Sequence, residues 1–434
     1  MRDVGRSDDP NVQAQLNRLK SVSIKHDTLS LDAIKTLLGR LDNPQRSLPP
    51  VFHVAGTNGK GSTCAFLRNI LECEGYVVHC TTSPHLVRYN ERIRIAGQLI
   101  GDERLAPLLK NVIDRSEGLG CSFFEITIAA AFCEFARVEA DACIVEVGLG
   151  GRLDATNILE PENLAACGIT ALGFDHEDFL LSPEKGVPKI PIARIAFEKG
   201  GIIKPNVPVV TMGNNYPKPA QDMLRKLAEQ KGAPLYEHGT HWSFDDHNGG
   251  KYRNQNIKIS LEEIKLPGRH QKLNASLAIA MIQNQKKIRV GCDAIRKGLA
   301  ETTWPARMQT LAEGPLTSIC PNRKLIIDGA HNLNAGNAIA AEFKERVHVI
   351  LGMLDNKDPK AIVKPFKNKI KTLQVVPLSG HKAHPSHKFG KDAIYRKNIR
   401  EALASLPPDD RPVLITGSLY LAGEVLSLNL QIPS

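Results

Sequence analysis

The segment "VFHVAGTNGKGSTCAFL" (residues 51–67) restricts the possible folds of this chain more than any other segment. An apolar stretch with the length of a strand enters a glycine-rich bend, and a helix-like stretch follows. Such a strand–bend–helix unit can hold a phosphate on backbone N–H groups and on the helix N-terminus. A glycine-rich turn without a ligand is the alternative. The common pattern G-x-x-x-x-G-K-[ST] fails here, because it requires glycine at Val54 and Ser or Thr at Gly61.

The bend still contains the residue types that a nucleotide requires. Gly56, Gly59 and Gly61 let the backbone approach a phosphate closely. Lys60 can reach the outer phosphates, and Ser62 can offer its hydroxyl to Mg²⁺. The segment therefore predicts a nucleotide site formed by Gly56, Thr57, Asn58, Gly59, Lys60, Gly61 and Ser62.

Short β-rich runs alternate with longer helical segments along the whole chain. Such runs occur at 51–55, 76–80, 141–147, 165–172 and 207–212, and again at 324–330, 347–353, 372–378 and 412–418. Alternation of this kind predicts an α/β fold with parallel sheets. The segment "TTWP" (302–305) interrupts helical character between the two series. We therefore expect two domains, a P-loop ATPase-like parallel-sheet domain over 1–300 and a smaller Rossmann-like α/β domain over 301–434.

The formal net charge of +10 is compatible with nucleic acid, an acidic surface or small anionic substrates. The basic residues are interspersed with acids and aromatic residues make up only 5%, which argues against a platform for nucleic acid. No stretch reaches the ~18 apolar residues of a membrane span. The nine cysteines form no C-x-x-C pair and lie mostly in apolar stretches, as in a reduced protein. We expect a cytoplasmic monomer that binds small molecules and neither nucleic acid nor membrane.

Two strand ends carry groups that can bind a metal. Glu146 ends the apolar run "DACIVEV", and Asp175 with His176 follows "GITAL". Ligands of open parallel sheets gather at the carboxyl ends of strands, where the loop after "VFHVA" also lies. Taken alone, Glu146 would more often be a cap or an ion-pair partner, and His176 a structural histidine.

One histidine-rich segment has a different interpretation. "HKAHPSHKF" contains His381, His384 and His387, but no carboxylate or cysteine accompanies them at ligand spacing. A solvated loop is favoured over a zinc site.

Together, the motifs resemble the folylpolyglutamate synthase/dihydrofolate synthase family, whose members are Mur-ligase-like, ATP-dependent amide-forming enzymes. The resemblance spans roughly residues 28–425. It rests on "HVAGTNGKGST", "TSPHLVRYNERIRI", "FFEITIAAAF", "EVGLGGRLDATN", "DHEDFL", "FEKGGIIKP", "LPGRHQKLNA", "WPARMQ" and "DGAHN". The short form of the phosphate loop is a trait of this family.

The resemblance implies ATP and two Mg²⁺ ions, with the phosphates and their ion held by Lys60 and Ser62. Ser83 and Glu146 correspond to ligands of that ion, and His176 to a ligand of a second ion. Lys199 matches a lysine that is carbamylated in relatives, which turns a cation into an anionic ligand. The family pattern is not followed throughout: the spacing from His176 to Lys199 is longer, through the piece "GVPKIP", and "EKGG" replaces "EKAG".

Further roles follow from the same resemblance. Arg307 corresponds to the arginine that reaches the terminal phosphate, Asp328 and His331 to nucleotide contacts, and Asn274 to a position near the adenine. The positions that line the pterin pocket in bacterial relatives are Phe124, Asp154 and Ala155.

The implied reaction joins L-glutamate to 7,8-dihydropteroate through an acyl phosphate and extends the glutamate tail of reduced folates. The second domain would close over ATP and bind glutamate. A monofunctional enzyme of either kind is an alternative. A nucleotide-driven switch or a nucleic-acid-associated ATPase is the alternative from another class, and it would need neither Lys199 nor "DGAHN".

Overall fold

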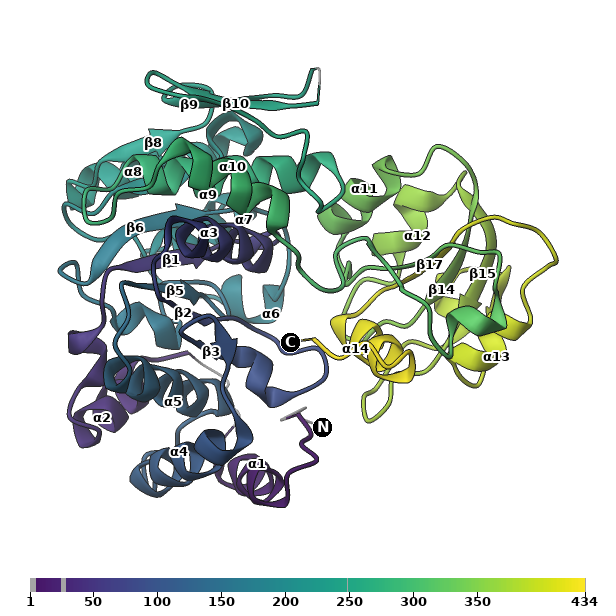
Figure 1. Ribbon diagram of the computed structural model, residues 1–434, viewed down its shortest axis with the longest axis horizontal. Coiled ribbons are helices and arrows are strands. Elements are labelled where there is room, and N and C mark those ends of the chain that lie inside the picture. The colour runs from purple at the N-terminus through teal and green to yellow at the C-terminus, as the bar shows by residue number, and fades with distance from the viewer. Residues whose placement is uncertain (1–4, 25–28, 248, 434) are drawn as a thin grey trace. The chain divides into compact units, whose positions relative to one another are not determined.

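The computed structural model describes residues 5–24, 29–247 and 249–433, which form two compact units. The larger unit comprises residues 4–265 and 270–303. The smaller unit is built mainly from residues 304–434 and also takes in residues 266–269. Figure 1 colours the larger unit from purple to green and the smaller one from green to yellow.

The larger unit is built on an eight-stranded sheet in the order β4-β3-β2-β5-β1-β6-β7-β8. Figure 1 shows β6, β1, β5, β2 and β3 succeeding one another in this order. All neighbouring strands are parallel except β2–β3 and β3–β4, so the expected parallel sheet has an antiparallel edge. The strands are β1 (Val51–Ala55), β2 (Val78–Thr81), β3 (Ile93–Ile95), β4 (Gln98–Leu99), β5 (Ala142–Glu146), β6 (Leu164–Ile169), β7 (Val209–Thr211) and β8 (Leu235–Glu237).

Helices connect these strands and bury their apolar positions against the sheet or against one another. In α4, the buried residues Leu105, Leu108, Leu109 and Val112 recur every three or four positions, which defines one apolar face. The helix α3 packs on β1, β2 and β5, and α5 packs on β2 and β3. The helices are α1 (Pro10–Val22), α2 (Asp32–Arg40), α3 (Lys60–Glu74), α4 (Asp102–Arg115), α5 (Phe123–Arg137), α6 (Glu177–Leu180), α7 (Pro191–Gly200), α8 (Lys218–Lys231), α9 (Arg269–Gln283) and α10 (Cys292–Glu301).

A separate three-stranded antiparallel sheet belongs to the same unit and was absent from the sequence prediction. It consists of β9 (Trp242–Asp245), β10 (Lys251–Asn254) and β11 (Lys258–Ser260), in the order β11-β10-β9. Its indole and phenol rings stack, with 6.1 Å between the ring centroids of Trp242 and Tyr252. The strands are only three or four residues long and their apolar residues stand singly between polar ones, so they lack the apolar runs by which the other strands were predicted.

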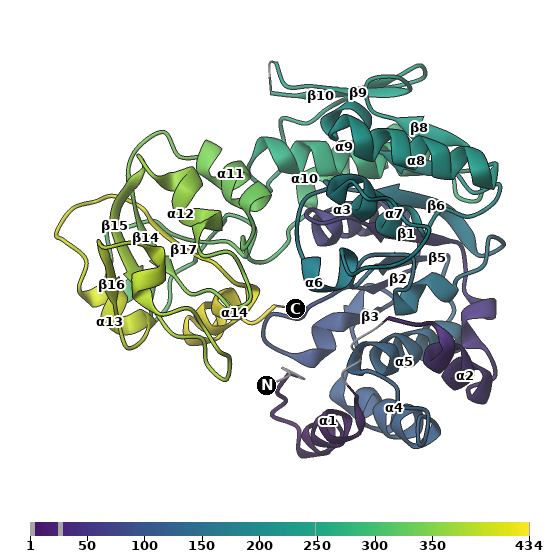
Figure 2. The same cartoon turned by 180° about the vertical axis from the view of Figure 1, so that it is seen from behind.

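The smaller unit contains a six-stranded sheet in the order β12-β13-β17-β14-β15-β16. Only the short β12 runs antiparallel to its neighbour, and β16 forms the other edge (Figure 2). The strands are β12 (Gln309–Thr310), β13 (Leu325–Ile327), β14 (Val347–Leu351), β15 (Ile370–Val375), β16 (Ala393–Tyr395) and β17 (Val413–Thr416). The helices are α11 (Leu333–Ala341), α12 (Lys360–Phe366), α13 (Ile399–Ala404) and α14 (Leu419–Leu428).

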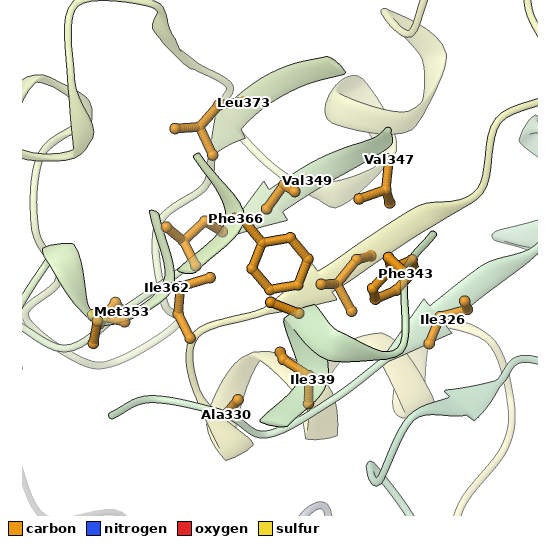
Figure 3. Packing of buried hydrophobic residues seen from close by; sticks show 14 of the residues in the cluster. Ile326, Ala330, Ile339, Phe343, Val347, Val349, Met353, Ile362, Phe366 and Leu373 are labelled. Carbon is orange, nitrogen blue, oxygen red and sulfur yellow. The ribbon is translucent and has the colours of Figure 1, made fainter. Parts of the chain in front are cut away.

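The core of the smaller unit lies where α11 and α12 meet the sheet. Phe343 and Phe366 pack with 5.7 Å between their ring centroids, and Val349 of β14 lies beside Phe366 in Figure 3. The sheet therefore has its own hydrophobic core, as expected of an independent α/β unit.

Two further observations bear on the class of protein. All nine cysteines lie in the described part of the chain and are free thiols, in agreement with the prediction from their spacing. No helix in the described part of the chain combines the length and apolar character that a membrane crossing requires.

Candidate functional site

The segment between β1 and α3, residues 56–62, is called here the phosphate loop. Gly56 and Gly59 have φ of +151° and +90°, and a side chain at either position would meet another residue. A Cβ at Gly56 would lie 1.7 Å from Thr170 Oγ1, and one at Gly59 would lie 2.4 Å from Asn274 Oδ1. Both positions therefore require glycine.

The phosphate loop is tied to the chain that follows β6. The Thr57 amide donates to the carbonyl oxygen of Ala171 at 2.8 Å. The Thr170 hydroxyl donates to the carbonyl oxygen of Asn58 at 2.8 Å, and the Thr57 hydroxyl donates to that of Gly173 at 2.9 Å. These bonds fix the bend and leave the N-terminus of α3 to face a ligand.

Two lysines that are 139 positions apart in the sequence (199 minus 60) meet at one carbonyl group. Lys60 Nζ donates to the carbonyl oxygen of Gly56 at 3.2 Å, and Lys199 Nζ donates to the same oxygen at 3.0 Å. Lys199 is buried. Burial first, and then the charge of Lys60, lower the pKa of Lys199 to about 7. The structure thus brings the two predicted lysines together and makes one of them a readily deprotonated amine.

Ser62 lies in the first turn of α3 with its hydroxyl oxygen buried. This oxygen has no hydrogen-bonding partner among the described residues. A buried hydroxyl without a partner costs free energy unless a ligand occupies it, and Mg²⁺ prefers oxygen ligands. Ser62 therefore fits the predicted role of metal ligand.

Glu146 and Ser83 lie together at the neighbouring strand ends. Glu146 is the last residue of β5, pairs in register with Val54 of β1, and is buried. Its Oε2 accepts a hydrogen bond from the amide of Ser83 at 3.0 Å. The strand-end argument thus placed Glu146 beside the strand that leads into the phosphate loop.

His176 lies at the surface, in a left-handed conformation with φ of +52°, as the residue that precedes α6. The carboxylate of Asp175 accepts from the His176 amide at 2.9 Å. Asp175 is also one of the charges that act on Lys199, so this segment lies near the buried amine.

The three predicted pterin-pocket residues gather at residues 148–156, called here the Asp154 turn. Asp154 Oδ1 accepts from the amide of Thr156 at 3.0 Å and from its hydroxyl at 2.6 Å, and Oδ2 accepts from the amide of Leu149 at 2.8 Å. Burial raises the pKa of the Asp154 carboxyl, and these hydrogen bonds oppose that shift. Ala155 is buried beside it. The Phe124 ring packs over Gly148, where a Cβ would lie 2.4 Å from Phe124 Cζ.

Asn274 is buried in α9, and its side-chain NH₂ donates to Gln271 at 3.1 Å. Its carboxamide packs against Gly59, so the structure places it directly against the phosphate loop.

In the smaller unit, Asp328 follows β13 and organises the segment that contains Arg307. Its carboxylate accepts from the amides of Met308 and Ala330, each at 2.8 Å. Burial raises the pKa of Asp328, whereas the charge of Arg307 lowers it. Arg307 lies between two residues with positive φ, Ala306 and Met308. His331 Nδ1 lies 2.8 Å from the carbonyl oxygen of Gly329.

Two rings of the histidine-rich segment after β15 make contacts within the smaller unit. His384 Nε2 donates to the carbonyl oxygen of Lys357 at 2.7 Å, and the His381 ring stacks on Tyr420. No group of three or more His, Cys, Asp or Glu side chains with the geometry of a metal site occurs in the part of the chain that the structure describes.

Sequence reasoning missed several residues that shape the site. Thr170 packs on Gly56 of the phosphate loop, and Arg152 and Arg194 pair with Glu198, the residue before Lys199. A polar residue directly after a strand could have suggested Thr170. Arg194 and Glu198 are four residues apart on α7, a spacing that could have suggested their pairing, whereas Arg152 reaches Glu198 from a distant segment that no sequence spacing indicates.

Comparison with known proteins adds independent information. No family model matches the chain. The chain is 33% identical over 431 residues to the dihydrofolate synthase/folylpolyglutamate synthase of Bacillus subtilis, covering 91% of this chain and 94% of that protein.

Solved structures of similarly named proteins resemble this chain along nearly its whole length. The E. coli FolC structure in complex with DHPP and ADP superposes with a TM-score of 0.82 at 28% identity, over 96% of this chain and 97% of that one. The bifunctional enzyme of Yersinia pestis, complexed with AMPPNP and a Mn ion, gives a TM-score of 0.81 at 27% identity, over 96% and 97% of the two chains. Because the Bacillus subtilis relative matches along nearly the whole length of both chains, the chain belongs to the dihydrofolate synthase/folylpolyglutamate synthase family.

Proposed function

We propose that the protein joins L-glutamate to 7,8-dihydropteroate with consumption of ATP, and that it also extends the γ-glutamyl tail of reduced folates. The observation that carries the proposal is the convergence of Lys60 and Lys199 on the Gly56 carbonyl beside the unpartnered hydroxyl of Ser62. The ammonium group of Lys60 and a buried hydroxyl at a helix N-terminus suit a polyphosphate, and a readily deprotonated Lys199 suits its metal.

The reaction consists of two displacements. A carboxylate oxygen of the pterin substrate attacks the γ-phosphorus of ATP, the bond from that phosphorus to the bridging oxygen breaks, and ADP leaves. The amino nitrogen of glutamate then attacks the acyl carbon and loses a proton, and inorganic phosphate leaves with the electron pair of the C–O bond. Activation is needed because a free carboxylate has no adequate leaving group.

The residues of the chain position these groups and neutralise charge. Lys60 reaches the outer phosphates, and the phosphate loop offers its backbone N–H groups. We assign Arg307 to the terminal phosphate, with Asp328 holding its segment and His331 beside it. Phe124, Asp154 and Ala155 shape the pterin end, and Asn274 supports the loop next to the nucleotide.

The metal set that we assign consists of Ser62, Ser83, Glu146, His176 and Lys199. Bound Mg²⁺ would neutralise charge on the transferring phosphoryl group. Lys199 can serve as an anionic ligand after its neutral amine adds CO₂ and releases a proton, and a pKa near 7 makes that neutral amine available at physiological pH.

We also assign the protein to the cytoplasm, where ATP is plentiful and thiols stay reduced. Nine free cysteines suit such a compartment. Two domains, residues 1–300 and 301–434, would separate the phosphate loop from the glutamate-binding part, and we infer that the protein works as a monomer.

One assay tests the proposal. Dihydropteroate and tetrahydrofolate are supplied separately, each with glutamate, ATP and Mg²⁺, and the products are identified by mass. Gain of one glutamyl residue on both acids supports a bifunctional enzyme, and gain on only one supports a monofunctional enzyme. ATP hydrolysis that responds to DNA or RNA, with neither acid modified, would contradict the ligase.

A further inference from the structure

Four charged side chains near Lys199 form a closed arrangement, called here the charge ring. Its members are Arg152, Glu184, Arg194 and Glu198. Arg152 contacts Glu184 at 2.5 Å and Glu198 at 3.0 Å. Arg194 contacts Glu184 at 2.8 Å and Glu198 at 2.9 Å. Each cation therefore bridges both anions, and each anion bridges both cations.

One side of the ring is buried and the other reaches solvent. The side chains of Arg194 and Glu198 are 5% and 6% exposed, whereas those of Arg152 and Glu184 are 26% and 40% exposed. The Phe197 ring lies near both guanidinium groups, at 5.3 Å and 5.6 Å from its centroid. Hydrogen bonds from Arg194 and then Arg152 hold the pKa of Glu184 below its usual value.

The ring connects the three segments that carry Glu146, His176 and Lys199. Arg152 lies in the turn after Glu146, and its amide donates to the carbonyl oxygen of Glu198 at 2.7 Å. At Gly151, a Cβ would lie 2.8 Å from the carbonyl oxygen of Lys199, so this turn touches the lysine backbone.

The third segment joins through Arg194. Its Nε donates to the carbonyl oxygen of Leu180 at 3.1 Å, at the end of α6. That short helix begins directly after His176, whose carbonyl oxygen accepts from the Leu180 amide at 3.0 Å. A shift of Arg194 would therefore be passed to the His176 segment and to α7 together.

We propose that the charge ring is the frame that holds the metal-binding segments in register, and that Glu184 is the residue that closes it. This inference rests on the proposed function. Glu184 lies between His176 and Lys199, two residues before the extra piece "GVPKIP", so this stretch contributes a brace rather than a new metal ligand. Glu184 is a positioning residue, because its carboxylate accepts hydrogen bonds from Arg152 and Arg194, which lie outside the assigned metal set.

The contacts explain why Glu184 affects the geometry of the charge ring more than its partial exposure suggests. Removing its charge leaves two guanidinium groups to share Glu198, with Arg194 still buried. An isolated surface ion pair contributes little, but a network with two buried members constrains geometry. Outer partners of metal ligands affect metal affinity by about 10–100-fold when they are replaced.

The test compares Glu184→Gln with Glu184→Asp and with the matched control Glu139→Gln, which removes an equal charge from an exposed residue elsewhere in the larger unit. Binding of Mn²⁺ is measured by electron paramagnetic resonance in the presence of AMPPNP, without turnover. We expect Glu184→Gln to weaken Mn²⁺ binding about 10-fold. We expect Glu184→Asp to restore part of this loss and Glu139→Gln to leave the affinity unchanged.

Two further measurements separate positioning from folding. In the free protein, amide hydrogen exchange over residues 176–202 should accelerate in Glu184→Gln, while exchange in the strands β1 and β5 stays as it was. In turnover, excess Mg²⁺ should recover kcat, and the KM for dihydropteroate should not change. A variant with lower thermal stability but unchanged Mn²⁺ affinity would overturn the inference, as would a variant without any change. The unaltered protein could bind Mn²⁺ with AMPPNP and yet modify neither pterin acid. In that case the proposed function fails, but the difference in Mn²⁺ affinity between the unaltered protein and Glu184→Gln still decides the role of the charge ring.

Discussion

The phosphate loop and the Asp154 turn both follow parallel strands and are both rich in glycine, and both carry residues that the family resemblance assigns to the site. Their polar atoms differ in the hydrogen-bonding partners that they have. In the phosphate loop, two lysines share one carbonyl oxygen, and the Ser62 hydroxyl has no partner among the described residues. In the Asp154 turn, both carboxylate oxygens accept hydrogen bonds from the turn itself.

This difference separates two ways in which a residue serves a site. The loop holds the positive charge of Lys60 and the Ser62 hydroxyl, which has no partner among the described residues, and both suit a bound ligand. The turn uses its carboxylate to hold its own backbone, so its contribution to the pterin pocket that we propose would be the shape of the backbone. A substitution in the loop should therefore affect the reaction more than folding, and one in the turn should affect folding first.

The largest effect is expected from Lys60→Met. Lys60 Nζ makes one hydrogen bond, to Gly56, and is only partly buried, so the free energy of unfolding should change by less than about 0.5 kcal/mol. The value of kcat/KM should fall about 10³-fold, or ~4 kcal/mol, because charge on the phosphates loses its partner. Steady-state kinetics and denaturant unfolding measure the two quantities. Lys189→Met, at an exposed lysine of the same unit, should leave both as they are. Loss of folding in Lys60→Met would show that the loop depends on this lysine for its structure.

The Asp154→Asn substitution should affect the stability of the fold first, whereas Lys60→Met affects the reaction. The Asn side chain would turn an NH₂ group toward buried N–H or O–H donors that now meet a carboxylate, at a cost of about 3 kcal/mol in the free energy of unfolding. Urea unfolding followed by circular dichroism measures this cost. Asp8→Asn, at an exposed aspartate, is the control. A variant as stable as the unaltered protein would mean that the turn does not need the carboxylate, which would leave it free to contact substrate.

The sequence predicted the loop and much of the fold, and its failures have physical reasons. The runs at 51–55 and 347–353 coincide with β1 and β14 because buried parallel strands are continuous apolar stretches. The short, polar strands β9 to β11 have no such signature. The position of Glu146 at the end of a strand could be predicted from the sequence. The hydrogen bonds that Asp154 accepts from Thr156 and Leu149 could not, because no pattern of residue types reveals which donors a buried carboxylate will meet. The meeting of Lys60 and Lys199 likewise depends on the packing of α7 against the loop.

A third prediction concerns pH and uses His53, which extends the hydrogen bonds of the Asp154 turn. His53 Nε2 lies 2.9 Å from the Thr156 hydroxyl oxygen, and burial first, then the charge of Lys204, lower the pKa of His53 to about 3. Below pH 6.5 the unfolded chain takes up a proton that the folded protein refuses until about pH 3, so stability falls as the pH decreases through this window. Between pH 7 and pH 5 this group should remove about 2 kcal/mol.

The measurement is urea unfolding of the protein and of His53→Gln at both pH values. The difference between the two pH values should shrink by that amount in His53→Gln, and it should not change in His387→Gln, where the histidine is exposed. An equal pH dependence in all three proteins would show that His53 is protonated in the folded state, and that the turn tolerates a cation.

The smallest effect is expected from Ser62→Ala, set against Thr156→Val. Both remove a buried hydroxyl from the larger unit, but the Ser62 oxygen has no partner among the described residues, whereas the Thr156 oxygen bonds Asp154 and His53. Thr156→Val should therefore lower the free energy of unfolding by about 2 kcal/mol, and Ser62→Ala should change it by less than about 0.5 kcal/mol. The effect of Ser62→Ala should instead appear as an increase of about 10-fold, or ~1.4 kcal/mol, in the Mg²⁺ concentration that gives half-maximal turnover. If Ser62→Ala destabilises the protein as much as Thr156→Val does, its hydroxyl is bonded within the fold, and the distinction between the loop and the turn does not hold at this residue.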